Sequence, residues 1–144
     1  MKIGFTGTRW GGSEAQKATL EKYLRSLQRE SLVFECHHGD CVGADAEFAD
    51  LCAKVYRCCV RIICHPPIDE SHRAFTTNAA ETLPPLTHFA RNRDIVNACD
   101  VMVVCPWDME HQPRGGTWYT FDVAMKQKKP VFVVWPDGSV QRPE

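Results

Sequence analysis

A pair of glycines marks the stretch of this chain best suited to bind an anion. Gly115 and Gly116 follow a strand-forming run over 101–105 and precede a predicted helix over 118–126. Without a Cβ, glycines let the backbone approach a ligand, and Thr117 can cap the helix through its hydroxyl. Unpaired N–H groups and a positive dipole at the helix start suit a phosphate. The alternative is a glycine-rich loop that holds no ligand, because short glycine motifs are common.

Two more glycine loops occupy the same place in a strand–loop–helix unit. The first follows the predicted strand 2–6 and the second follows the predicted strand 32–36. Their candidate ligand-binding residues are Gly7, Thr8 and Arg9 in the first loop, and His38, Gly39, Asp40, Gly43, Ala44 and Asp45 in the second. Three loops of the same chemistry are a stronger signal than one.

The elements that position these loops alternate between strand and helix. The predicted strands are 2–6, 32–36, 60–64, 101–105 and 131–135, and predicted helices begin near residues 13, 44, 90 and 118. Continuous apolar strands predict a parallel sheet covered on both faces. We therefore expect an α/β, Rossmann-like three-layer sandwich with a mostly parallel five-stranded sheet in the order 3-2-1-4-5. In such a sheet the three loops meet at one crevice beyond the strand ends.

Outside this alternation, two segments are less regular. The polar stretch 68–88 predicts a long functional loop or lid, with a short helix over 69–81 as the alternative. The tail after 138 is expected to fray. Near the other end of the chain, Ser13 and Gln16 form a capping-box pattern that predicts the beginning of the first helix.

Composition limits the classes of function. With 144 residues the chain is expected to form a single domain, 1–144, and a net charge of −1 argues against a broad nucleic-acid or membrane surface. No stretch approaches the ~20 apolar residues of a membrane span, and no signal peptide precedes the first strand, so a cytoplasmic location is expected.

The chain contains 8 cysteines. Without an export signal these are expected to be reduced thiols, and several fall in apolar runs where cysteine is a small buried hydrophobe. Clusters such as 36–41 and 58–65 contain no Cys-x-x-Cys pair, so we predict neither a metal site nor a cofactor.

Together, the motifs resemble those of the SLOG superfamily, which includes the DNA-processing protein DprA/Smf, the LOG phosphoribohydrolases and small YspA-like proteins. The matching residues are 5–9, 38–45, 91–93, Asp100 before a strand, and 115–117. The resemblance is greatest to the YspA-like group. It implies a Rossmann-like fold that binds a nucleotide or nucleotide-derived ligand. Relatives in this superfamily often form dimers or larger assemblies, so a homo-oligomer is a further expectation.

Each candidate residue has a functional and a structural interpretation. Arg9 can pair with a phosphate through its guanidinium fork or remain a solvated loop arginine. Asp45 can accept hydrogen bonds from ribose hydroxyls or a base edge, or only stabilise the first turn of its helix. His38 can contact the ligand or be a buried core histidine. The resemblance implies that Arg91 contacts phosphate and that Asn92 holds the loops together.

Two tryptophans flank the glycine loops. Trp10 and Trp118 can each stack on a base or simply pack in the fold.

Catalysis is less well supported than binding. The LOG enzymes, which cleave the N-glycosidic bond of nucleoside monophosphates, rely on an arginine and on a glutamate three residues after the motif threonine. Thr120 occupies that position here, and threonine cannot serve as a carboxylate base. An enzyme of this type would use Arg91 with a carboxylate from another position, either Asp122 or Asp45, with Asp40 and Glu47 as further alternatives. The leading hypothesis is a ligand-binding sensor or sequestering protein, followed by a phosphoribohydrolase and by a DNA-processing accessory protein.

Overall fold

A computed structural model of the protein describes residues 1–143. Its strands are β1 (Lys2–Gly7), β2 (Glu35–His38), β3 (Arg61–Cys64), β4 (Glu81–Thr82), β5 (Val101–Cys105), β6 (Val131–Val134) and β7 (Val140–Gln141). Its helices are α1 (Glu14–Glu30), α2 (Ala44–Tyr56), α3 (His88–Ala98) and α4 (Gly116–Lys126), with a 3-10 turn η1 (Arg57–Cys59).

The sheet is mostly parallel but larger than the sequence predicts. Within residues 1–143 it has seven strands in the order β4-β3-β2-β1-β5-β6-β7, and only the β6–β7 pair among them is antiparallel. The predicted count of five, and hence the predicted order for the complete sheet, are therefore wrong. The five predicted strands form its centre as β3-β2-β1-β5-β6. The additional edge strands have two residues each, too few to show a hydrophobic pattern.

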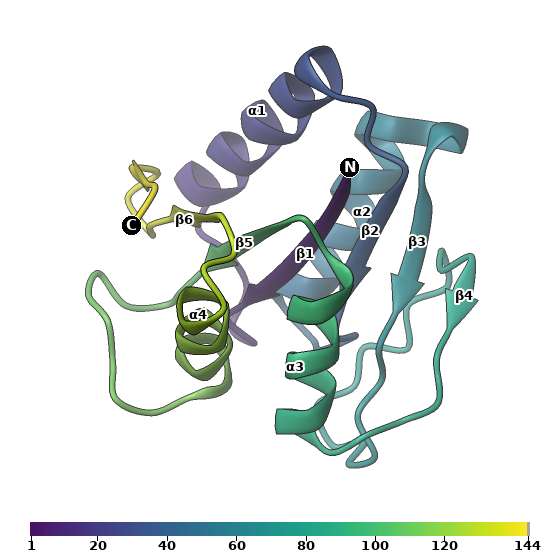
Figure 1. The fold of residues 1–144 in the computed structure, drawn as a ribbon, viewed down its shortest axis with the longest axis vertical. Helices are drawn as coiled ribbons and strands as arrows, with labels where there is room; N and C mark the ends of the chain where they lie inside the picture. The colour runs from purple at the N-terminus through teal and green to yellow at the C-terminus, as the bar shows by residue number, and fades with distance from the viewer. Residues whose placement is uncertain (144) are drawn as a thin grey trace.

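Helices cover both faces of the sheet, as Figure 1 shows. Leu20 and Leu24 of α1 and Phe48 of α2 pack in one core with Ile3 and Phe5 of β1. On the opposite face, α3 and α4 form a second core with β5 and β6, in which Ile95, Val96, Met102, Val104 and Ala124 are buried. Two separate cores with the sheet between them make the three layers of a Rossmann-like α/β fold.

Several element boundaries differ from prediction. The second strand begins at Glu35 rather than at residue 32, and the side chains of Leu32 and Phe34 before it are exposed. Helix α4 begins at Gly116 with Gly115 as its N-cap, so the predicted capping role of Thr117 is wrong. Segment 69–81 contains no helix and leads into β4, and the tail predicted to fray instead contains β7.

The start of α1 fixes the loop after β5. Ser13 and Gln16 form the predicted capping box. The Gln16 side chain is buried and donates to the carbonyls of Pro106 at 3.0 Å and Val134 at 2.7 Å. Because a buried amide needs such partners, Gln16 ties α1 to the loop that leads toward α4.

No helix within residues 1–143 has both the length and the apolar character needed to cross a membrane.

Candidate functional site

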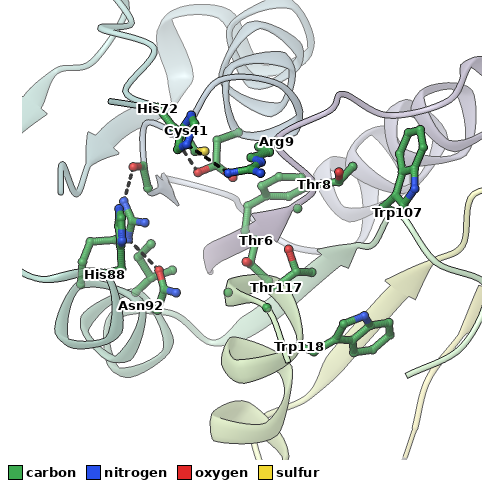
Figure 2. A pocket seen from close by; sticks show the side chains of 18 of the residues that line it. Thr6, Thr8, Arg9, Cys41, His72, His88, Asn92, Trp107, Thr117 and Trp118 are labelled. Atoms are coloured by element: carbon green, nitrogen blue, oxygen red, sulfur yellow. Dashed lines mark hydrogen bonds between the residues drawn. The ribbon is translucent and has the colours of Figure 1, made fainter. Parts of the chain in front are cut away.

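The carboxyl ends of β1, β2 and β5 open into one cavity of about 600 Å³. Figure 2 shows its walls: Thr6 and Thr8 come from β1 and its loop, Asn92 from α3, and Thr117 from α4. The predicted residues that line the cavity are Gly7, Thr8, Arg9, Gly39, Asp45, Arg91, Asn92, Gly115, Gly116 and Thr117. The volume lies within the range of small-molecule sites.

One wall of the cavity is the start of α4. Gly115 has a φ of 106°, and no side chain caps the helix there. Gly116, Thr117 and Trp118 line the cavity, so the first N–H groups of α4 lie at its wall. Uncapped N–H groups and the helix dipole favour an anion at this position.

Arg9 is held at the mouth of the cavity by two neighbours. Its guanidinium lies over the Trp10 ring at 4.7 Å, and its Nη1 donates to His72 Nε2 at 3.0 Å, which requires a neutral imidazole (Figure 2). His72 comes from the loop after β3, and nothing in the sequence indicated this contact. Arg9 therefore presents a positive charge beside the cavity in a defined orientation.

Arg91 lies at the bottom of the site and is buried. Its Nη1 donates to the carbonyl oxygens of Gly39 and His65, and its Nε donates to Asn92 Oδ1 at 2.6 Å. A Cβ on Gly39 would lie 2.7 Å from Arg91 Nη1 and 3.0 Å from Asp45 Oδ2. Only glycine at this position leaves room for the arginine and the carboxylate together.

Asp45 is a buried carboxyl group beside this arginine. Its Oδ2 accepts from the Cys41 N–H at 3.2 Å. Burial raises the pKa of Asp45 to about 6, although the charge of Arg91 and backbone hydrogen bonds lower it. A carboxyl group that titrates near neutral pH can act as an acid or a base.

The raised pKa predicts how Asp45→Asn affects stability. Above pH 6 the folded protein must keep a buried charge, so the neutral variant should be more stable at pH 7–8, by at most about 3 kcal/mol. Below the ordinary pKa of 3.8 the Asp45 carboxyl is neutral in the folded and in the unfolded protein, so the difference in stability between the variant and the unchanged protein should vanish. Urea unfolding at pH 8 and pH 3.5 measures this, with Asp50→Asn on the exposed face of α2 as the control. A variant that is less stable at pH 8 would contradict the prediction.

Asp40, a predicted ligand residue, lies outside the cavity wall. Its φ of 56° turns its fully buried carboxylate toward the loop after β3. There it accepts from Arg73 Nε at 2.8 Å, Thr76 N–H at 3.0 Å and Thr76 Oγ1 at 2.8 Å. Burial alone raises the pKa of Asp40, but these hydrogen bonds outweigh it and hold the pKa below its usual value. Asp40 fastens the loop that carries His72.

Three other predicted residues of the second glycine loop also lie outside the cavity wall. His38 is fully buried, and its Nδ1 accepts from the Asp40 N–H; burial lowers its pKa to about 4, so the ring is neutral. The Ala44 N–H donates to the Thr8 carbonyl at 2.9 Å, and Gly43 packs directly against the backbone of Arg9. These contacts position the first glycine loop against the second.

Asp122, predicted as a catalytic alternative, lies on α4 outside the cavity wall. It is exposed and lies 2.8 Å from His111 Nε2, in the loop before that helix. Thr120 is fully buried, and its hydroxyl donates to the Gly116 carbonyl at 2.7 Å. Of the predicted carboxylates, Asp45 alone lines the cavity.

The rim of the cavity contains aromatic side chains from three segments. Trp10, Phe89 and Trp107 are 66%, 56% and 62% exposed, and all three line the cavity. The sequence singled out Trp10 but not Phe89 or Trp107. The positions of these two rings at the rim depend on how α3 and the loop between β5 and α4 fold. Exposed rings at the rim of a cavity offer faces on which a planar ligand can stack.

Within the part of the chain that the structure describes, no three His, Cys, Asp or Glu side chains are arranged to hold a metal ion. The thiols within residues 1–143 form no disulfide. Cys41 lines the cavity, where burial raises its pKa to about 11, so it is a thiol rather than a thiolate.

No family model matches the chain, and no curated protein matches it in sequence. Similar solved structures do exist. A molybdenum cofactor binding protein from the phototrophic bacterium Rippkaea orientalis is 19% identical with a TM-score of 0.67, covering 93% of this chain and 76% of that chain. The chain shares its fold.

The same holds for two further structures. The Moco carrier protein from Chlamydomonas reinhardtii is 19% identical with a TM-score of 0.61, covering 92% of this chain and 74% of that chain. DNA processing protein A from Helicobacter pylori, described with a single-stranded DNA binding mode, is 18% identical with a TM-score of 0.63; 92% of this chain and 64% of that chain are covered. At such identities the likeness concerns the fold alone.

Proposed function

We propose that this protein is a member of the SLOG superfamily that binds a nucleotide or nucleotide-derived ligand, as a sensor or sequestering protein. The observation that carries the proposal is the convergence of three glycine loops on one cavity, beside Arg9 and the uncapped start of α4. Backbone N–H groups and a guanidinium together suit a phosphate better than a neutral ligand.

The remaining walls suggest how such a ligand would lie. Its phosphate would contact the N–H groups of α4 and the guanidinium of Arg9. A planar heterocycle would stack on the exposed rings of Trp10 or Trp107, and hydroxyl or amine donors would reach Asp45. The fold neighbours bind a molybdenum cofactor or single-stranded DNA, so both belong among the ligands to test.

A screen of ligands tests binding. The panel contains nucleoside mono- and diphosphates, NAD, ADP-ribose, cyclic nucleotides, the molybdenum cofactor and a short single-stranded oligonucleotide. We expect at least one phosphate-containing ligand to raise the melting temperature, because binding to the folded state alone stabilises it. Arg9→Ala should lower the affinity for that ligand by about tenfold or more, because a charge-assisted pair between the guanidinium and the phosphate is lost.

Arg93→Ala is the matched control, because Arg93 lies on α3 but outside the cavity wall, bonded to the Tyr119 hydroxyl. It should bind normally. No stabilisation by any ligand, or equal losses in the two arginine variants, would count against the proposal.

A second candidate is a nucleotide N-glycosidase, and the raised pKa of Asp45 favours it. A buried carboxyl group with a pKa of about 6 beside Arg91 is suited to proton transfer during cleavage. Chromatography of nucleoside monophosphates after incubation would show free base. In that case Asp45→Asn should abolish release, whereas Asp122→Asn, outside the cavity, should not.

A further inference from the structure

A second hollow lies between α1 and the C-terminal strands β6 and β7. We call it the α1–β7 groove; its volume is about 710 Å³. Lys22, Arg25 and Arg29 of α1 form one wall, and Val140 and Gln141 of β7 with Arg142 form the other. Figure 1 shows the C-terminal hairpin beside α1, and the two are joined by a hydrogen bond from Thr19 Oγ1 to the Gly138 carbonyl. No residue is shared with the glycine-loop cavity.

The groove is basic although the whole chain is nearly neutral. Arg25 is paired with Glu21 at 3.0 Å, but no carboxylate within residues 1–143 forms a salt bridge with Lys22 or Arg29. These two residues are seven positions apart, so they lie on one side of the helix about 10 Å from each other along its axis. A row of this length fits several negative charges better than a single phosphate.

The floor of the groove argues against a nucleic acid. The Phe132 ring is buried and stacks on Tyr23 with centroids 3.6 Å apart, and Arg142 lies 5.4 Å from its centroid. The Phe132 ring therefore offers no free face to a nucleobase. Proteins that bind single strands combine a basic groove with aromatic rings on which bases stack, and this ring cannot supply that stacking.

The edge of the sheet favours a polypeptide. Strand β7 is the last strand in the sheet order found for residues 1–143, so its outer edge has no strand partner there, and Val140 is 49% exposed. An extended peptide can pair with such an edge. On one face of a strand, side chains recur about every 7 Å, so carboxylates on three alternate residues span about 14 Å, enough to cover the row of cations.

We propose that the α1–β7 groove binds an extended acidic segment of a partner protein. Its main chain would lie along β7, and its carboxylates would contact Lys22, Arg29 and Arg142. This inference is independent of what the glycine-loop cavity binds.

Fluorescence anisotropy with a labelled peptide of alternating glutamate and threonine tests the inference. The double variant Lys22→Glu/Arg29→Glu should bind this peptide at least about tenfold more weakly, because attraction becomes repulsion. The control Arg93→Glu/Lys126→Glu makes the same change in charge on α3 and α4, outside the groove, and should retain affinity within about twofold. Circular dichroism checks that both variants are folded.

Three outcomes would overturn the proposal. The first is no binding of the acidic peptide by the unchanged protein. The second is equal weakening in the two double variants, which would indicate a general charge effect. The third is groove-dependent binding of an oligothymidylate of equal charge in preference to the peptide, which would assign the groove to a nucleic acid.

Discussion

Gly43→Ala should destabilise the protein by about 4 kcal/mol or more, enough to unfold much of it. Gly43 has a φ of 88°, a conformation that alanine rarely adopts. The added Cβ would also lie 2.4 Å from the Arg9 carbonyl oxygen and 2.8 Å from the Gly11 nitrogen. Both are backbone atoms, so no side chain can move aside to relieve the overlap. Urea unfolding of the purified variant, or loss of its soluble yield, measures the effect.

Gly115→Ala is the matched control for this substitution. Gly115 also has a positive φ, 106°, but no atom from elsewhere in the fold lies within 4 Å of the position that its Cβ would occupy, so only the conformational cost remains. That cost should be about 1–3 kcal/mol. Equal stabilities of the two variants would contradict the view that Gly43 is needed for the close contact between the first two glycine loops.

Asp40→Asn should cost about 2–4 kcal/mol at pH 7. Asparagine tolerates the positive φ of Asp40, so the substitution tests the carboxylate itself. The amide cannot accept all the hydrogen bonds from Arg73 and Thr76. The Arg73 guanidinium also loses its nearer carboxylate partner and keeps only the longer contact with Glu70 at 3.9 Å. Trypsin should also cleave the peptide bond after Arg73 faster, because the Asp40 carboxylate no longer holds this loop in place.

The effect of Asp40→Asn should depend on pH. Since the pKa of Asp40 is lowered in the folded state, its stabilisation is present above the ordinary pKa of 3.8 and is lost as pH falls through the lower folded pKa. The control is Asp69→Asn in the same loop, an exposed carboxylate that accepts hydrogen bonds from the N–H and hydroxyl of Ser71. A loss in Asp40→Asn no larger than in this control would show that Asp40 is not the main anchor.

The sequence predicted elements well where hydrophobic runs are long. Residues 101–105 are five consecutive apolar residues, and the predicted strand matches β5 residue for residue. The same reasoning missed β4 and β7, which have two exposed residues each and depend on pairing with distant strands. The shift of β2 from 32–36 to 35–38 has a related cause, since Leu32 is apolar yet exposed.

For the site, sequence predicted which loops meet but not where each side chain lies. The strand–glycine–helix pattern identified Gly7, Gly39 and Gly116, and the structure brings them to one cavity. Asp40 follows Gly39 directly, but its positive φ turns the carboxylate away, which no pattern reveals. The contact of His72 with Arg9 depends on the path of a long irregular loop, so only the folded structure shows it.

The most direct test of the proposed binding site is a ¹H–¹⁵N NMR titration with the nucleotide that stabilises the protein most. If the glycine loops bind its phosphate, the backbone N–H signals of Gly116, Thr117 and Trp118 should shift together with those of Thr8 and Arg9. Shifts confined to other surfaces, such as the α1–β7 groove, or no shifts at saturating nucleotide, would contradict the account.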